Sequence, residues 1–143
     1  MTIYADSSFF ISLHLIDARS QEAWRRISSL RDEVWLTPLN RAEFAHAVFL
    51  HAFRQAATAV EAERTINNLD QECESGIWQL VDLPGGTFAR STEPACRYGP
   101  TLGVRTLDSL HVACALELKA DRFWSFDARQ ERLAVAAGLD TSP

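Results

Sequence analysis

Short apolar runs alternate along this chain with longer stretches in which apolar residues recur every three or four positions. The short runs predict buried strands at residues 2–5, 34–36, 77–81 and 122–126. The periodic stretches predict helices at residues 9–16, 17–30, 38–57, 59–76, 106–118 and 128–137. Short strands that alternate with helices are typical of a mainly parallel sheet covered on both faces. We therefore expect an α/β fold, with a last edge strand after Leu139 as a further candidate.

The helix predicted from residue 106 is apolar on nearly all sides, which indicates a buried helix. Thr106 is its predicted N-cap, and Asp108 then lies in the first turn, where the helix dipole favours an acid. A carboxylate that opens a buried helix is costly unless something pairs with it. We therefore expect Asp108 to meet a partner from elsewhere in the chain.

Three further acids are predicted at the same edge of the sheet as Asp108. Asp6 and Asp127 each follow a strand, and Glu43 lies near the start of a helix, so all can face the carboxyl ends of the strands. Four such charges close together would repel by several kcal/mol even at an effective dielectric of roughly 20. They would therefore take up protons or bind cations. Oxygen ligands favour Mg²⁺ or Mn²⁺, and one or two such ions would activate water and neutralise a phosphate.

Each acid also has a local structural interpretation. Asp6 could be only a strand-end cap, and Asp127 could be an N-cap with Gln130 three residues on. Glu43 could pair with nearby Arg41. Asp108 is the hardest of the four to explain locally, because its helix has no other reason to carry a charge into the core.

Several polar residues near these acids are candidate supporting groups. Ser7 and Ser125 lie one and two residues from an acid, where they could orient a carboxylate or a bound water. His46 and His111 each follow an acid by three residues; both metal ligation and burial with a satisfied hydrogen bond remain open. Ser7 and Ser8 are predicted to cap the first helix. The four tryptophans lie in core-like patterns and are assigned to packing: Trp24, Trp35, Trp78 and Trp124.

The charge balance argues against binding nucleic acid through phosphate contacts alone, because the net charge is −5. Arginine supplies all but one of the cations, and three arginines are candidate phosphate contacts: Arg90, Arg97 and Arg105.

The length predicts one domain over residues 1–143. The three cysteines of the chain fit neither a zinc site nor a disulfide framework. No apolar run is long enough for a membrane helix and the start lacks a signal-peptide pattern, so we expect a cytoplasmic protein with no membrane partner.

Four pieces of the chain, in this order, resemble the PIN-domain ribonucleases, and more narrowly the toxin subunit of VapBC-type toxin–antitoxin modules. The pieces are Ile3–Ser8, Asn40–Glu43, Thr106–Ala115 and Ser125–Gln130. Each piece is short, and the specificity lies in finding all four in register. Residues 84–104, which contain Pro94 and are punctuated by glycine and proline, match least.

The resemblance implies a three-layer α/β/α sandwich with a central parallel sheet of four or five strands. It also implies Mg²⁺- or Mn²⁺-dependent endonucleolytic cleavage of RNA by an ion-activated water, with Asp6, Glu43, Asp108 and Asp127 holding the ions. The implied partners are an RNA substrate, a second copy in a homodimer, and a VapB-type antitoxin whose tail blocks the acidic pocket, often with an arginine. Two alternatives stay open: a housekeeping RNA-processing nuclease, and a non-catalytic module that docks a basic segment.

Overall fold

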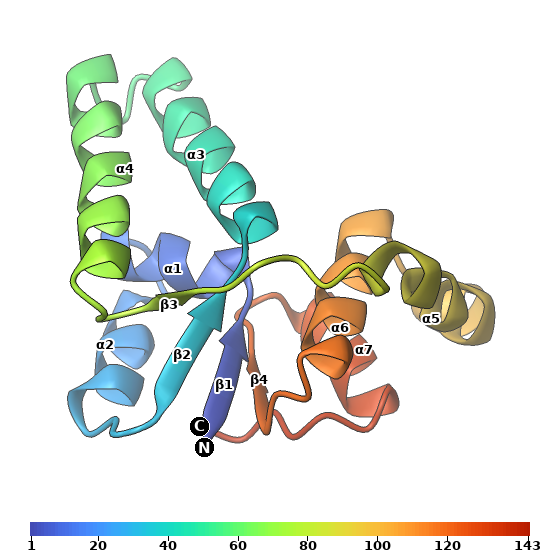
Figure 1. Ribbon diagram of the computed structural model, residues 1–143. Coiled ribbons are helices and arrows are strands. Elements are labelled where there is room, and N and C mark those ends of the chain that lie inside the picture. Colours follow the sequence, from blue (N-terminus) through green and yellow to red (C-terminus); the bar gives the residue numbers. More distant parts are fainter.

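A computed structural model describes residues 1–143 and has a central sheet of four parallel strands in the order β3–β2–β1–β4 (Figure 1). The strands are β1 (Thr2–Ala5), β2 (Glu33–Leu36), β3 (Gln79–Leu80) and β4 (Arg122–Trp124). Ala5 pairs with Trp124, so the carboxyl ends of the two strands β1 and β4 lie side by side. The strand predicted after Leu139 is reduced to one parallel bridge, between Asp140 and Arg122.

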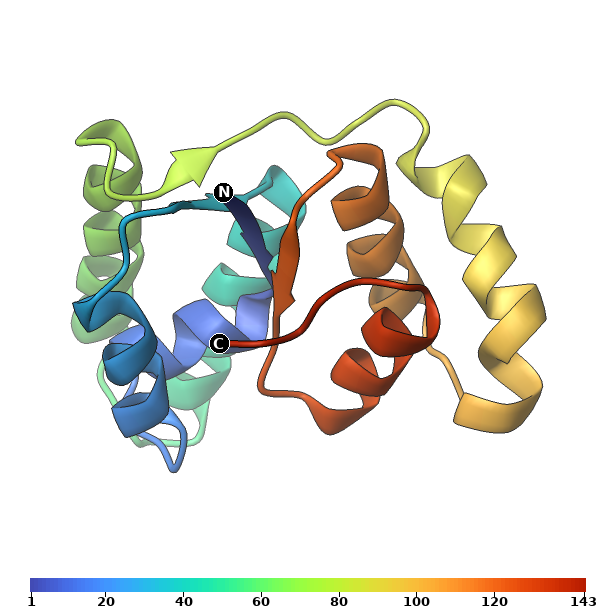
Figure 2. The ribbon, with the colours of Figure 1, turned by 90° about the horizontal axis from the view of Figure 1, so that it is seen from below.

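Helices cover both faces of the sheet, which confirms the three-layer α/β/α architecture (Figure 2). One face carries α1 (Ser7–His14), α2 (Ser20–Ser28), α3 (Pro38–Phe53) and α4 (Ala59–Glu74). The other carries α5 (Thr87–Leu102), α6 (Thr106–Glu117) and α7 (Ala128–Ala136). None of these helices is both long and apolar enough to cross a membrane.

The alternation of side chains along β1 divides the core into two clusters. Ile3 and Ala5 point toward α1–α4, where they pack with Phe9 and other apolar side chains. Tyr4 points to the opposite face and packs with Phe123 and Val112 among the side chains of α6 and α7. Tyr4 also brings a polar hydroxyl into that second cluster, close to the edge where the acids gather.

The segment that was hardest to interpret from sequence forms the single helix α5, which continues through Pro94 and Pro100. Proline inside a helix removes a backbone hydrogen bond and is unfavourable by about 3 kcal/mol in isolation. Here Pro94 is buried, and Tyr98 and Leu102 pack onto the same apolar cluster as α6 and α7. Tertiary packing therefore stabilises a helix that the local sequence disfavours.

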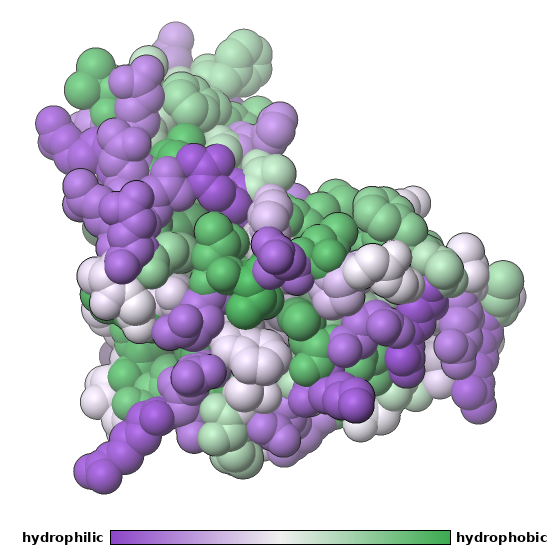
Figure 3. All heavy atoms as spheres, viewed as in Figure 1, coloured by the Kyte–Doolittle hydropathy of each residue, from purple (hydrophilic) through white to green (hydrophobic).

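Two other local predictions need correction. Trp24 is 57% exposed rather than packed in the core, because it lies on the outer side of α2. That helix is shorter than its pattern predicts, since residues 17–19 form a turn in which the carboxylate of Asp17 accepts a bond from the Arg19 N–H. The acidic residues of α4 are exposed or half-buried, and hydrophilic side chains run along this helix in Figure 3.

Candidate active site

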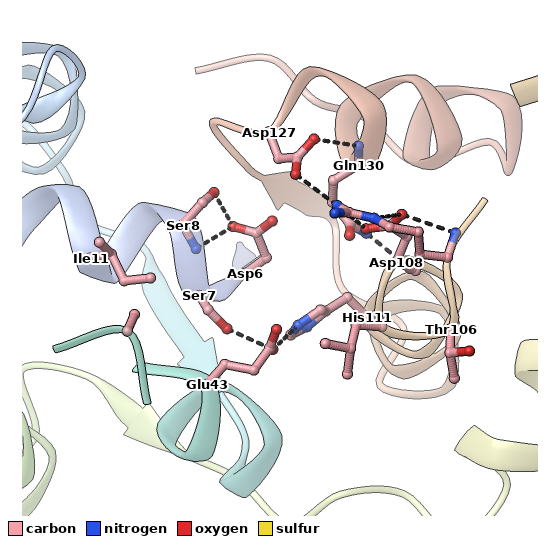
Figure 4. Close-up of a pocket in the computed structure, with 13 residues that line it drawn as sticks. Asp6, Ser7, Ser8, Ile11, Glu43, Thr106, Asp108, His111, Asp127 and Gln130 are labelled. Atoms are coloured by element: carbon pink, nitrogen blue, oxygen red, sulfur yellow. Dashed lines mark hydrogen bonds and ion pairs between the residues drawn. The ribbon is translucent and has the colours of Figure 1, made fainter. Parts of the chain in front are cut away.

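An open pocket of about 490 Å³ lies at the carboxyl ends of β1 and β4. Its lining includes all four acids singled out from sequence, which come from four separate segments of the chain (Figure 4). In that view Asp127 and Glu43 lie on opposite sides of the pocket, with Asp6 and Asp108 between them. The acids are Asp6, Glu43, Asp108 and Asp127.

Asp6 is fixed where β1 passes into α1. Its backbone N–H donates to the carbonyl of Trp124 at 2.9 Å, which continues the pairing of β1 with β4. Its carboxylate accepts a hydrogen bond from the Ser8 N–H at 3.0 Å and another from Ser125 Oγ at 2.6 Å. Asp6 itself is therefore the N-cap of α1, and the prediction that Ser7 and Ser8 cap this helix is wrong. Burial raises the pKa of Asp6, and the nearby His111 and serine hydroxyls only partly oppose that effect.

Asp108 finds its partner three residues away. Helix α6 begins at Thr106 with Arg105 as its N-cap, so the predicted cap at Thr106 is wrong by one residue. The Asp108 carboxylate turns back to accept a bond from the Arg105 N–H at 3.1 Å. The Arg105 guanidinium adds two more bonds to this carboxylate, from Nε at 3.1 Å and from Nη2 at 3.2 Å.

Asp127 is both an N-cap and a wall of the pocket. One oxygen accepts bonds from the N–H groups of Arg129 and Gln130 at the start of α7, as the sequence predicts for a cap. The other oxygen faces Arg105 Nη2 at 3.1 Å. The Gln130 side chain does not complete a capping box but donates to the Asp108 carbonyl at 3.0 Å. Gln130 thereby ties α7 to the first turn of α6 and sets two of the acids relative to each other.

Glu43 enters the pocket from α3 and is held at one of its oxygens. Ser7 Oγ donates to Oε1 at 2.8 Å, and His111 Nε2 makes a short contact with the same oxygen. Burial tends to raise the pKa of Glu43, but the hydrogen bonds and charge supplied by His111 and Ser7 lower it overall. The proposed local pair with Arg41 is wrong, because Arg41 forms a two-bond ion pair with Asp70 on α4, both bonds at 2.7 Å.

The three candidate phosphate-binding arginines differ in position. Arg105 lines the acidic pocket and joins two of its carboxylates. Arg90 and Arg97 lie on α5, where Arg90 pairs with Glu117 and Arg97 lies over the ring of Tyr98. Neither of these two lines the acidic pocket. Ser125, by contrast, bonds directly to Asp6.

The donor set has the chemistry of a site for hard divalent cations, since its ligating atoms are carboxylate oxygens. The Arg105 guanidinium lies between Asp108 and Asp127, where it supplies the positive charge that a bound cation would otherwise supply. No three His, Cys, Asp or Glu side chains lie close enough together to hold a metal in this arrangement. The residues therefore suit such an ion in kind, and its binding would require Arg105 to give up its carboxylates.

The protein is therefore an α/β sandwich of parallel strands, with an acidic pocket at the carboxyl edge of its sheet. The model of the PIN domain family matches residues 3–136, and the chain belongs to that family. A search of curated proteins found no match to the sequence.

Solved structures share the fold over nearly the whole chain at low sequence identity. VapC20 of Mycobacterium tuberculosis, described as a toxin that cleaves the sarcin–ricin loop, is 18% identical with a TM-score of 0.72, covering 98% of both chains. VapBC-1 of nontypeable Haemophilus influenzae is 16% identical with a TM-score of 0.69, covering 99% of this chain and 97% of the other. VapBC2 of Rickettsia felis, solved with promoter DNA, is 12% identical with a TM-score of 0.68, covering 99% and 98%.

Proposed function

We propose that this protein is a Mg²⁺- or Mn²⁺-dependent endoribonuclease and the toxin of a VapBC-type, type II toxin–antitoxin module. The observation that carries the proposal is the convergence of Asp6, Glu43, Asp108 and Asp127 in one pocket. Membership of the PIN domain family and the similarity of the fold to VapC chains support it.

In this proposal the four acids would hold one or two divalent cations, directly or through waters. A bound cation would lower the pKa of a water and neutralise charge on the attacked phosphodiester. The water oxygen would bond to phosphorus as the P–O3′ bond breaks, and the proton lost by the water would end on the departing O3′, which leaves a 5′-phosphate and a 3′-hydroxyl. Ser7 and Ser125 keep the carboxylates of Glu43 and Asp6 oriented through bonds of 2.8 Å and 2.6 Å.

Arg105 has two roles in this proposal. Without a cation, it offsets the repulsion between Asp108 and Asp127. Once a cation takes these carboxylates, the guanidinium becomes free to contact a phosphate oxygen of the RNA, for which its planar fork of donors is suited. Arg90 and Arg97 on α5 are proposed as outer contacts along the RNA.

The proposed protein partner is a VapB-type antitoxin. The solved relatives named VapBC contain toxin and antitoxin together, which supports such a partner here. An antitoxin segment that carries an arginine would find the same two carboxylates that Arg105 now binds. We further propose that the toxin forms a homodimer.

The test is cleavage of RNA by the purified protein, with Mg²⁺ or Mn²⁺ and with EDTA. We expect cleavage only with the metal, products with 5′-phosphate ends, and loss of cleavage in Asp6→Asn. Asp121→Asn is the matched control, because Asp121 also accepts two bonds, from the N–H and hydroxyl of Thr2, but lies at the other end of β1. Full activity in Asp6→Asn, or equal cleavage in EDTA, would contradict the proposal.

Two further measurements separate the alternatives. A protein that takes up no Mn²⁺ but binds an arginine-containing peptide tightly would be a docking module rather than a nuclease. A metal-dependent nuclease whose gene has no neighbour that encodes a small DNA-binding protein would be a housekeeping enzyme. Co-purification with the product of such a neighbouring gene, together with inhibition by it, supports the toxin.

A further inference from the structure

Behind Glu43 lies a chain of buried hydrogen bonds that the four-acid pocket alone does not explain. His111 on α6 contacts Glu43 through Nε2, and its Nδ1 lies 2.7 Å from the hydroxyl of Tyr4. That hydroxyl donates to Asn40 Oδ1 on α3 at 3.0 Å. Tyr4 and His111 are both buried, at 0% and 3% exposure. Polar groups this deep in a core of apolar side chains need defined partners.

The order of these groups is fixed from the Asn40 end. Asn40 Nδ2 donates to the Ala5 carbonyl at 2.7 Å, which fixes the orientation of the amide. Asn40 Oδ1 accepts bonds from the N–H and the hydroxyl of Thr37, at 2.9 and 2.8 Å, and from the Tyr4 hydroxyl at 3.0 Å. The oxygen of that hydroxyl lies against His111 Nδ1, while Nε2 on the other side of the ring contacts Glu43. The imidazole is therefore held at both nitrogens, which sets the direction of its contact with Glu43.

We propose that Tyr4 and His111 are positioning residues for Glu43. The Tyr4 hydroxyl fixes the imidazole of His111 in place, and His111 Nε2, with the Ser7 hydroxyl, holds the Glu43 carboxylate in the pocket. The inference rests on the proposed function in one respect, since it assumes that Glu43 serves the metal-dependent reaction.

Glu43 needs such an anchor because its side chain is long and the pocket around it is acidic. Asp6 and Asp108 line the same pocket and repel it. The Glu43 side chain is 25% exposed, so solvent offers it a competing orientation. Partners behind a metal-ligating side chain set its orientation, and their removal commonly lowers metal affinity or activity by about 10- to 100-fold.

The first test compares the only two tyrosine hydroxyls in the chain. Tyr4→Phe removes the hydroxyl that holds His111 Nδ1, whereas Tyr98→Phe removes a hydroxyl that donates to the Ala136 carbonyl at 2.7 Å, away from the pocket. We expect Tyr4→Phe to lower kcat and weaken Mn²⁺ binding by about 10-fold each, at the lower end of the range for such partners, with KM for RNA unchanged. Tyr98→Phe should change neither value.

The second test reads the position of the histidine directly. In NMR spectra of the metal-free protein, a ring N–H of His111 held by hydrogen bonds should exchange slowly with water, and Tyr4→Phe should make that exchange too fast to observe. This measurement does not require nuclease activity, so it tests the positioning even if the protein does not cleave RNA. An equally slow exchange in Tyr4→Phe, or wild-type kcat and Mn²⁺ affinity in that variant, would overturn the inference.

The third test uses a second, half-buried histidine–glutamate pair as its control. His14 Nε2 lies 2.8 Å from Glu72 Oε2 but outside the acidic pocket. His111→Leu should lose about 100-fold in kcat, and His111→Gln, whose amide N–H can still donate to Glu43, should recover part of that loss. His14→Gln should keep full activity. Combining Tyr4→Phe with Glu43→Gln should cause no loss beyond that of Glu43→Gln alone, because the two changes act on one interaction. Equal losses in the leucine and glutamine variants, or additive losses in the double variant, would argue against positioning.

Discussion

Replacement of Arg105 by glutamine tests whether this arginine and a divalent cation compete for the same carboxylates. The variant removes one positive charge and the three side-chain bonds to Asp108 and Asp127. Arg105→Gln retains the backbone N–H bond from position 105 to Asp108. The change is therefore confined to the guanidinium.

The expected loss of stability depends on how exposed the ion pair between Arg105 and Asp108 is. The side chain of Asp108 is 5% exposed but that of Arg105 is 57% exposed, so solvent screens the pair strongly. Charge-assisted hydrogen bonds contribute about 1.5–3 kcal/mol when shielded and exposed pairs about 0–1 kcal/mol. We therefore expect Arg105→Gln to destabilise the metal-free protein by about 1–2 kcal/mol, which corresponds to a fall in Tm of roughly 5 °C.

Addition of Mn²⁺ should reverse this difference. In the wild type a cation must displace Arg105, whereas in the variant the carboxylates are already free. With about 1.4 kcal/mol for each factor of ten, the variant should bind Mn²⁺ roughly 10-fold more tightly. The two proteins should approach the same Tm as Mn²⁺ reaches saturation.

The assay is thermal unfolding in EDTA and across a Mn²⁺ titration, with Arg41→Gln as the matched control. Arg41 also forms a two-bond pair, with Asp70, but outside the pocket and with both side chains partly exposed, at 43% and 34%. The control should lose less stability than Arg105→Gln in EDTA, about 0–1 kcal/mol, and this loss should stay the same at every Mn²⁺ concentration. A gap between Arg105→Gln and the wild type that persists at saturating Mn²⁺ would refute the competition.

Two further predictions concern protonation. Burial raises the folded-state pKa of Asp6, so its contribution to stability becomes less favourable as pH rises from about 4 through that raised value. Asp6→Asn keeps a capping side chain and should raise Tm in EDTA at pH 7.5 by roughly 3 °C, with less advantage at pH 4; a lower Tm at pH 7.5 would contradict this. Burial also raises the pKa of Cys73 and Cys114 to about 11 each, whereas Cys96 is exposed. One thiol should therefore react rapidly with Ellman's reagent at pH 8, and Cys96→Ser should abolish this reaction; two rapid thiols in the folded wild type would be inconsistent with the structure.

Much of the architecture was accessible from local pattern. The alternation of short apolar runs with periodic stretches predicts parallel strands and covering helices. The two can be told apart because side chains return to the same face about every two residues in a strand and about every 3.6 residues in a helix. The positions of Asp6 and Asp127 after strands place them at one edge, since parallel strands end on the same side. These predictions succeed because each depends on residues close together in the chain.

The sequence leaves the structure open, or misleads, where a local preference meets a distant contact. Pro94 and Pro100 disfavour a helix, yet burial against α6 and α7 keeps α5 continuous. Glu43 could have paired with Arg41, but α4 brings Asp70 to that arginine and α6 brings His111 to Glu43. Nothing in the spacing of either residue could choose between these partners.

Sequence pattern alone therefore identified every helix except α5, the strands, the edge of the sheet and the acids that face it. How those acids are held emerged only once the chain was folded: Arg105 between Asp108 and Asp127, and the buried run from Asn40 through Tyr4 and His111 to Glu43. The physical reason is that hydrogen bonds and ion pairs depend on ångström-scale placement of side chain atoms. Packing sets that placement among residues as far apart in the chain as Tyr4 and His111, and no local periodicity encodes it.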